Sequence, residues 1–65
     1  MKRIWLITAR LEKGLSQEKA AYEIGMATPS YCQIENGKSL PKVKTAKKIA
    51  NVLGVDWTKF YEEDV

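Results

Sequence analysis

Hydrophobic residues recur along this chain at the three- and four-residue intervals of a helix, not at the two-residue interval of a strand. The clearest run is Lys42–Leu53, whose apolar stripe consists of Val43, Ala46, Ile49, Ala50 and Leu53. Gly54 follows at once, which is typical of a helix C-terminus. Because the same period recurs through most of the chain, we expect an all-α fold.

The amino-terminal part carries two competing stripes. Residues 2–13 predict a first helix, which Gly14 ends. One stripe joins Leu6 to Arg10. The other consists of Ile4, Ile7 and Leu11. The two stripes point in different directions, so they cannot be buried equally.

Two shorter helices are predicted in the middle of the chain. Ser16 suits an N-cap, Gln17–Ile24 supplies two turns, and Gly25 permits the left-handed backbone of a helix end. The expected inner face of this helix consists of Ala20, Ala21 and Ile24.

The next helix, Pro29–Asn36, follows almost directly. Thr28 is the expected N-cap, with proline at the first helical position and Gly37 after the last. Tyr31 and Ile34 are expected to point inward. Two helices joined by a tight glycine turn are the arrangement with which small domains enter a DNA groove.

The rest of the chain is predicted to be a loop at Ser39–Pro41 and a short fifth helix, capped by Asp56 and running to about Tyr61. We therefore expect one domain over residues 1–65, a compact bundle of four to five helices.

Composition limits the possible classes of protein. With 45% hydrophobic and 29% charged residues, the chain is neither disordered nor membrane-spanning in composition. The apolar run Ile4–Ile7 is too short for a signal peptide, so a cytoplasmic location is expected. The single cysteine, Cys32, and the absence of histidine exclude an internal disulfide and the usual zinc site. We expect no cofactor and no metal, and the missing histidine argues against an enzyme.

Charge is unevenly distributed. Residues 1–55 carry ten Lys and Arg against four Glu, a net +6, whereas residues 56–65 carry one Lys against four acids, a net −3. A basic body with an acidic end suggests a polyanionic partner that the C-terminal segment does not touch. A solvated lysine surface is the alternative.

The outward face of the third helix carries side chains that fit a groove: Thr28, Pro29, Cys32, Gln33 and Asn36. Gln33 can pair with an adenine edge through two hydrogen bonds, and proline can touch a thymine methyl group. An ordinary solvated face would explain the same residues. Lys38 and Lys42 are predicted phosphate contacts. Lys42 lies at the start of the fourth predicted helix, where a cation opposes the helix dipole unless a phosphate is near. The remaining lysines of the fourth helix are expected to be solvated or steering charges: Lys44, Lys47 and Lys48.

Two further groups are notable. Arg10 and Glu35 lie at helical spacing from core positions, so they are expected to pair, unless they are two unrelated surface charges. At the C-terminal end, three aromatic residues fall within five positions, as a possible dimer contact or a lid on the first and fourth helices: Trp57, Phe60 and Tyr61.

The chain resembles the Cro/repressor-type, or xenobiotic-response-element-like, helix-turn-helix family in the motifs KGLSQEKAA, IG, QIENGKS and KIANVLGV. The resemblance implies a lambda-repressor-like fold with the helix-turn-helix at the second and third helices, and a homodimer on a two-fold symmetric operator. It also implies an ion pair between Arg10 and Glu35 and a set of DNA-binding residues. Gln17 would anchor a phosphate, and Asn36 and Lys38 would bind the backbone. Base-facing positions would be Ala27, Thr28, Pro29 and Gln33, with Ser30 between them.

Members of that family often have Ser or Thr where this chain has Ala27 and Lys42, an amide or a basic residue within Thr28–Pro29, and Leu where it has Ala20. Few hydrogen-bonding groups remain on the third helix. We therefore expect DNA shape and methyl contacts to carry more of the specificity than is usual.

The leading interpretation is a sequence-specific regulator of transcription that binds double-stranded DNA as a dimer, most simply a repressor that acts by steric exclusion, associated with the nucleoid when bound. The alternative is a protein-interaction module, an antitoxin or adaptor that uses the same bundle and its aromatic end.

Overall fold

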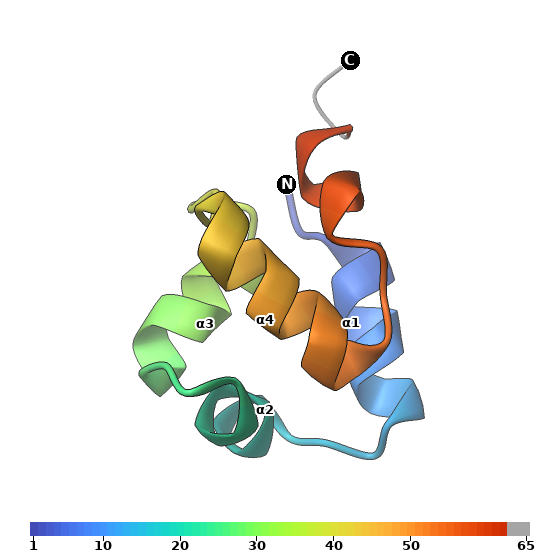
Figure 1. Cartoon of the computed structure of the whole chain (residues 1–65). Helices are drawn as coiled ribbons and strands as arrows, with labels where there is room; N and C mark the ends of the chain where they lie inside the picture. The colour runs from blue at the N-terminus through green and yellow to red at the C-terminus, as the bar shows by residue number, and fades with distance from the viewer. Residues whose placement is uncertain (63–65) are drawn as a thin grey trace.

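The computed structural model describes residues 1–62. Its elements are four α-helices and a short 3₁₀ helix: α1 (Ile4–Glu12), α2 (Gln17–Ile24), α3 (Thr28–Glu35), α4 (Val43–Leu53) and η1 (Trp57–Tyr61). Figure 1 shows α4 crossing the middle of the molecule, with α3 on one side, α1 on the other and α2 below. Residues 1–62 contain no strand, so the all-α expectation is confirmed. Of the acidic C-terminal segment, residues 63–65 lie outside the described part of the chain.

One core joins all five elements. The predicted inner residues of α2 are at most 6% exposed, and those of α3 at most 3%. The buried apolar residues are Leu6, Ala20, Ala21, Ile24, Tyr31, Ile34, Ala46, Ile49, Ala50, Leu53 and Phe60. None of the helices within residues 1–62 is long and apolar enough to cross a membrane.

Of the two stripes predicted for α1, the core uses the one that joins Leu6 to Arg10. Leu6 is fully buried and Arg10 is 9% exposed, whereas Ile4 and Leu11 are 62% and 61% exposed. The aliphatic stripe therefore faces outward, and the stripe that contains an arginine faces inward. The helix itself is shorter than the predicted span of residues 2–13.

The start of α3 differs from the prediction. Ala27, not Thr28, is the N-cap residue, and no side chain caps the helix. Thr28 is already helical and Pro29 follows it within the first turn, where a proline costs no hydrogen bond. The prediction was wrong by one residue because a proline in the first turn is compatible with more than one N-cap position.

The start of α4 also differs from the prediction. Lys42 is the N-cap residue, outside the first turn, and Val43 is 47% exposed, although the period predicted it to be buried. The remaining four residues of the predicted stripe are buried, and Gly54 ends the helix as expected. Val43 is exposed because the first turn of α4 extends beyond the core.

The last element packs as a lid. Asp56 caps η1 by accepting a hydrogen bond of 3.0 Å from the Thr58 backbone N–H. Phe60 is 1% exposed and packs edge-on against Trp5, with 5.0 Å between ring centroids. Of the two alternatives for the aromatic end, Phe60 therefore fits the lid and not the dimer contact, because its ring closes the core between α1 and α4.

Candidate functional site

The bounds of α2, which precedes the turn to α3, are set by a residue at each of its ends. Ser16 Oγ accepts a hydrogen bond of 3.0 Å from the Lys19 backbone N–H, which is the predicted N-cap. At the other end Gly25 has φ of 92°, a left-handed conformation that glycine adopts without strain. Only residues 25–27 separate α2 from α3, and this short turn holds the two helices in a fixed orientation.

The outer face of α3 is open to solvent. Tyr31, Ile34 and Glu35 are buried on its inner face, at 3% exposure or less. On the opposite face and at the N-cap, the exposed residues are Ala27, Pro29, Ser30 and Gln33, and the half-buried residues are Thr28, Cys32 and Asn36. The structure thus brings the residues predicted to face bases together on one surface.

Gln33 is the longest polar side chain on that surface. Its amide offers both a donor and an acceptor. Asn36, which is shorter and half-buried, carries another amide, and the remaining side chains of the surface offer only hydroxyl, thiol or apolar groups. Gln33 is exposed and makes no hydrogen bond through its side chain within the described residues. The described residues of η1 pack against α4 and do not cover α3. The arrangement can therefore present one long bidentate hydrogen-bonding side chain among smaller side chains.

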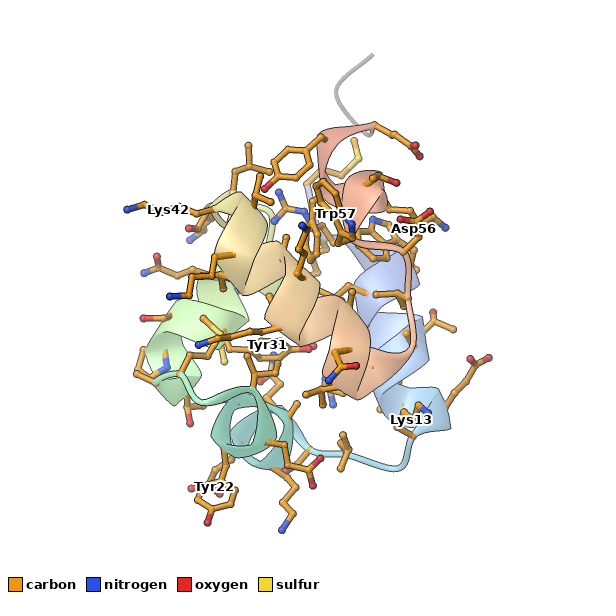
Figure 2. The ribbon with its side chains drawn as sticks, in the orientation of Figure 1. Lys13, Tyr22, Tyr31, Lys42, Asp56 and Trp57 are labelled. Atoms are coloured by element: carbon orange, nitrogen blue, oxygen red, sulfur yellow. The ribbon has the colours of Figure 1, made fainter. Side chains whose placement is uncertain are left out.

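Cations lie beside this face. Lys38 follows α3, and Lys42 precedes α4; both are exposed, and neither forms an ion pair with any of residues 1–62. Figure 2 shows Lys42 extending toward the side of the molecule on which α3 lies. Among the lysines within α4, Lys47 instead lies over the ring of Trp57, at 5.1 Å from its centroid.

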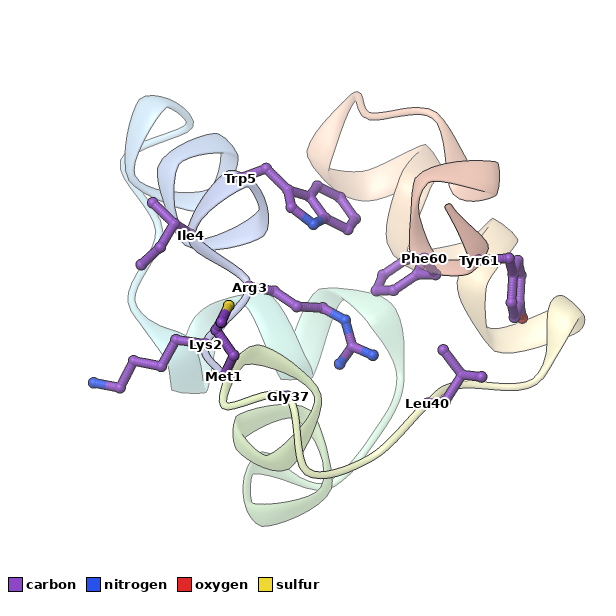
Figure 3. A pocket seen from close by; sticks show the side chains of 9 residues that line it. All are labelled: Met1, Lys2, Arg3, Ile4, Trp5, Gly37, Leu40, Phe60 and Tyr61. Atoms are coloured by element: carbon purple, nitrogen blue, oxygen red, sulfur yellow. The ribbon is translucent and has the colours of Figure 1, made fainter. Parts of the chain in front are cut away.

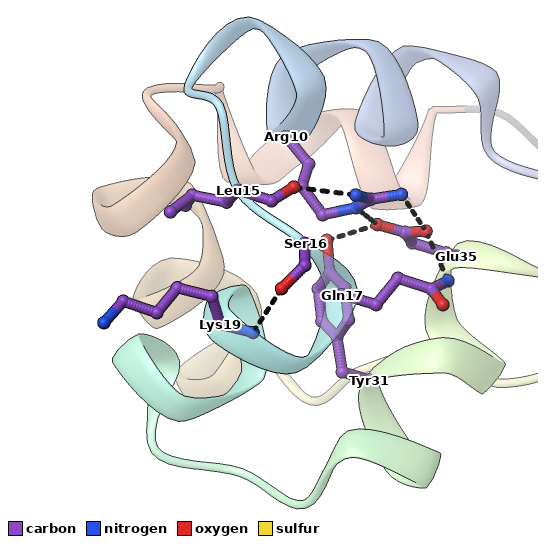
Figure 4. Close-up of polar contacts among 7 residues, drawn as sticks. All are labelled: Arg10, Leu15, Ser16, Gln17, Lys19, Tyr31 and Glu35. Carbon is purple, nitrogen blue, oxygen red and sulfur yellow. Dashed lines mark hydrogen bonds and ion pairs between the residues drawn. The ribbon is translucent and has the colours of Figure 1, made fainter.

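Behind the surface, a buried network joins α1, α2 and α3 (Figure 4). The Glu35 carboxylate accepts hydrogen bonds from Arg10 Nε (2.5 Å), Arg10 Nη2 (3.3 Å) and the Tyr31 hydroxyl (2.5 Å). Gln17 Nε2 donates a further hydrogen bond of 2.9 Å to the same carboxylate. Arg10 Nη1 donates to the Leu15 carbonyl at 2.8 Å. The structure therefore places Arg10 and Glu35 as the predicted pair and adds two partners that the sequence did not indicate.

The network shifts the pKa values of its members. Burial alone raises the pKa of Glu35, but hydrogen bonds from Arg10, Tyr31 and Gln17 outweigh it, so the pKa lies below the usual value. Hydrogen bonding to Glu35 raises the pKa of Arg10. Burial, and then the hydrogen bond to the carboxylate, raises the pKa of the Tyr31 hydroxyl. The carboxylate is thus ionised at neutral pH and holds its three partners in place.

Arg3 is a buried residue that the sequence analysis missed. Its guanidinium Nη1 donates to the Ile34 carbonyl and, at 2.7 Å, to the Ser39 carbonyl, so it binds the C-terminal end of α3. It is 7% exposed and lies over the Phe60 ring at 5.5 Å. Its spacing from Leu6 and Arg10, three and seven residues, is the signal that could have found it.

The aromatic end divides between core and surface. Trp57 is half-buried against Tyr61, with 6.0 Å between ring centroids, and Tyr61 is 40% exposed. The Tyr61 hydroxyl donates to the Pro41 carbonyl at 2.7 Å. Two of the three predicted contact residues therefore remain accessible.

The sequence model of a helix-turn-helix family matches residues 6–60 of the chain. The chain is 46% identical over 63 residues to YqaF, an uncharacterized HTH-type transcriptional regulator of Bacillus subtilis. The alignment covers 97% of this chain and 83% of YqaF. The chain is 39% identical over 46 residues to RstR, a transcriptional repressor of the cryptic phage CTXphi of Vibrio cholerae. This alignment covers 71% of this chain and 41% of RstR.

A solved structure is similar throughout the same region. The crystal structure of an HTH_3 family transcriptional regulator from Vibrio cholerae matches with a TM-score of 0.71 and 34% identity, over 91% of this chain. The match spans only 33% of that chain, so this chain is similar to one part of a longer regulator.

Proposed function

Because the chain belongs to the Cro/CI-type helix-turn-helix family of DNA-binding transcriptional regulators, we propose that it binds operator DNA sequence-specifically as a homodimer, with α3 in the major groove. The observation that carries the proposal is the open outer face of α3, which presents Gln33 while the opposite face is fixed in the core. Repression by steric exclusion is the simplest mode of action, and RstR is a relative named as a repressor. We place the protein in the cytoplasm, with the nucleoid when it is bound to DNA.

Base contacts come from the outer face of α3 and from its N-cap residue. Gln33 pairs with an adenine edge through its amide, and Pro29 and Ala27 contact thymine methyl groups. Thr28 and Ser30 each add a hydroxyl, which either bonds a base edge or a phosphate. Since only one long polar side chain is available, the deformability of the operator supplies much of the remaining specificity.

Phosphate contacts flank the groove. Gln17 is the first residue of α2, so its backbone N–H is one of the free donors at that helix end, and its side chain is held by Glu35. On the other side Asn36, Lys38 and Lys42 bind the backbone. A phosphate near Lys42 also relieves the opposition between this cation and the α4 dipole.

The homodimer would use Trp57 and Tyr61, the accessible part of the aromatic end. These residues lie on η1, which does not pack against the outer face of α3, so a contact there leaves α3 free for DNA. A two-fold dimer of this kind reads half-sites about one helical turn apart.

The proposal is tested by selecting binding sites from randomised duplex DNA with the purified chain and measuring affinity by fluorescence anisotropy at several salt concentrations. A palindromic site and a log–log slope of about −0.9 per phosphate contact are expected. Lys38→Gln and Lys42→Gln should each reduce the slope by about one. The matched control, Lys47→Gln, removes a lysine that lies over Trp57 and should leave the slope unchanged. No enriched sequence, or a flat salt dependence, would refute the proposal.

A further inference from the structure

The outward face of α1 is apolar and uncovered. Ile4 and Leu11 are 62% and 61% exposed, and Ile7 between them is half-buried. The three residues follow one another at intervals of three and four, which is the spacing of a seam along which two helices pack. We call this set the α1 stripe. The alignment of exposed apolar residues along one helix makes this face a candidate binding surface.

The α1 stripe faces away from the proposed DNA-binding surface. Leu6 and Arg10 on the inner side of α1 are buried, and Arg10 pairs with Glu35 on the inner side of α3. The outer sides of the two helices therefore point in opposite directions, and Figure 1 shows α1 and α3 on opposite sides of α4. The α1 stripe stays accessible when α3 is occupied.

The stripe continues toward the N-terminal end of the chain. A cleft of about 710 Å³ lies between this end and η1, and both Met1 and Ile4 border it. Figure 3 shows Trp5 and Arg3 pointing toward Phe60, while Ile4 and Lys2 extend the other way. Lys2 therefore shares the outer side with Ile4.

Charges at the two ends of the stripe have opposite sign. Lys2 lies before its first residue and Glu12 after its last; both are exposed, and neither forms an ion pair with another residue of the range 1–62. Lys13 does not neutralise Glu12 on this face, because its side chain lies against Gly54. The face thus runs from positive to negative along the helix. Its complement is the same face turned end to end.

We propose that the α1 stripe binds the α1 stripe of a second copy of this chain, with the two helices antiparallel about a two-fold axis near Thr8. In this arrangement Ile4 faces Leu11 of the other copy, and Lys2 faces Glu12 of the other copy. The two-fold axis repeats each of these contacts, so each occurs twice in the pair. A surface of three aliphatic side chains is far smaller than stable dimers need, so the pairing is weak unless the copies are held close together.

The consequence rests on the proposed DNA-binding function. Two copies paired through α1 direct their α3 surfaces outward in opposite directions. They would therefore hold two separate DNA segments together, rather than two half-sites of one operator, and the high local concentration of copies at clustered operators would populate the pair.

Disulfide cross-linking tests the pairing without DNA. In a Cys32→Ser background, Thr8→Cys places a thiol beside the two-fold axis, and oxidation with diamide should give a covalent dimer on a non-reducing gel. Asn51→Cys, at a position on α4 that is exposed as Thr8 is, is the matched control and should cross-link several-fold more slowly. Adding Leu11→Glu, at a position 61% exposed, should reduce the Thr8→Cys rate to that of the control. Equal rates for the two cysteines, or no effect of Leu11→Glu, would overturn the proposal.

Charge reversal tests the antiparallel register. Lys2→Glu or Glu12→Lys, each in the Thr8→Cys background, puts like charges together at both ends and should lower the cross-linking rate about fivefold. The double reversal should restore it. Single reversals without effect, or a double variant slower than either single, would exclude this register.

Failure of this inference is distinguishable from failure of the proposed function. Leu11→Glu lies opposite α3 and should bind a single operator duplex with unchanged affinity, while losing the ability to capture a second labelled duplex on an immobilised one. If the cross-linking results hold but no operator is selected, the DNA-binding proposal fails and the α1 pairing stands. If an operator is selected but cross-linking is indifferent to Leu11, the reverse holds.

Discussion

Gln17 Nε2 donates a hydrogen bond of 2.9 Å to Glu35 Oε1, and this bond joins the first residue of α2 to the last residue of α3. The same carboxylate is paired with Arg10 of α1. One ionised group therefore sets the relation between the start of α2, where a phosphate is proposed to bind, and the helix that is proposed to read bases. Stability and recognition are linked through it.

Replacing Glu35 with glutamine should strongly destabilise the fold. Arg10 would be left as a buried charge without a counter-charge, which costs about 3–5 kcal/mol of the free energy of unfolding. The measurement is urea denaturation followed by circular dichroism. In the double variant Arg10→Met, Glu35→Gln no charge is left unpaired, so part of the loss should be recovered. A double variant that loses the sum of both single losses would contradict the pairing.

The Glu35 network should make stability depend on pH in the acid range. The pKa of Glu35 is lowered in the folded state, so its contribution is fully present above the unfolded value near 4.5 and is lost as the pH falls through the folded pKa. The free energy of unfolding, measured by denaturation from pH 7 to pH 3, should fall steeply below about pH 4.5. Glu35→Gln should flatten this part of the curve. Asp56→Asn is the comparison. The pKa of Asp56 is also lowered, by hydrogen bonds from Thr58, but Asp56 is exposed, so this variant should flatten the curve less than Glu35→Gln does.

Ser16 and Thr28, the two residues that the sequence predicted as N-caps, should respond differently to alanine. Ser16→Ala removes the hydroxyl that caps α2 and should cost about 1 kcal/mol of stability. Thr28→Ala removes a hydroxyl that caps nothing, so its effect should stay within about 0.5 kcal/mol. Thermal unfolding of the two variants side by side makes the comparison. Equal losses would mean that Thr28 caps α3 in solution.

Gly37 and Gly25 should tolerate alanine unequally. Both have positive φ, so a Cβ costs about 1–2 kcal/mol at either position. A Cβ at Gly25 meets open space, whereas at Gly37 it would coincide with the Met1 backbone carbonyl. Gly37→Ala should therefore be the more destabilising substitution and should displace the N-terminal residues, which proton NMR of the backbone amides would detect. Similar losses at the two positions would show that Met1 does not pack there.

Much of the fold was predictable because its signals are local. Apolar spacing gave the inner faces of α2 and α3, and glycines gave the helix ends. The pairing of Arg10 with Glu35 was also accessible, because charges at core spacing must find each other. In each case the physical requirement could be read from neighbouring residues.

The predictions failed where the structure depends on contacts between residues that are far apart in the sequence. The aliphatic stripe on α1 is more hydrophobic than the one that contains Arg10, yet it is Leu6 and Arg10 that face the core, because Glu35 supplies a partner there. Phe60 is buried because Trp5, 55 positions earlier, offers an edge-on contact. The roles of Arg3 and of the Tyr31 hydroxyl likewise depend on groups brought close only by folding.

The binding of Gln33→Ala to a selected operator tests the central claim most directly. Gln33 is exposed on the outer face of α3, so its truncation should leave the unfolding curve unchanged and weaken operator binding by about 1–3 kcal/mol, with relaxed selectivity at one base pair. Tyr22→Ala, at an exposed position on α2, is the matched control and should bind as the unaltered chain does. If Gln33→Ala binds the operator with unchanged affinity and selectivity, α3 does not read bases through this residue, and the proposed mode of recognition is wrong.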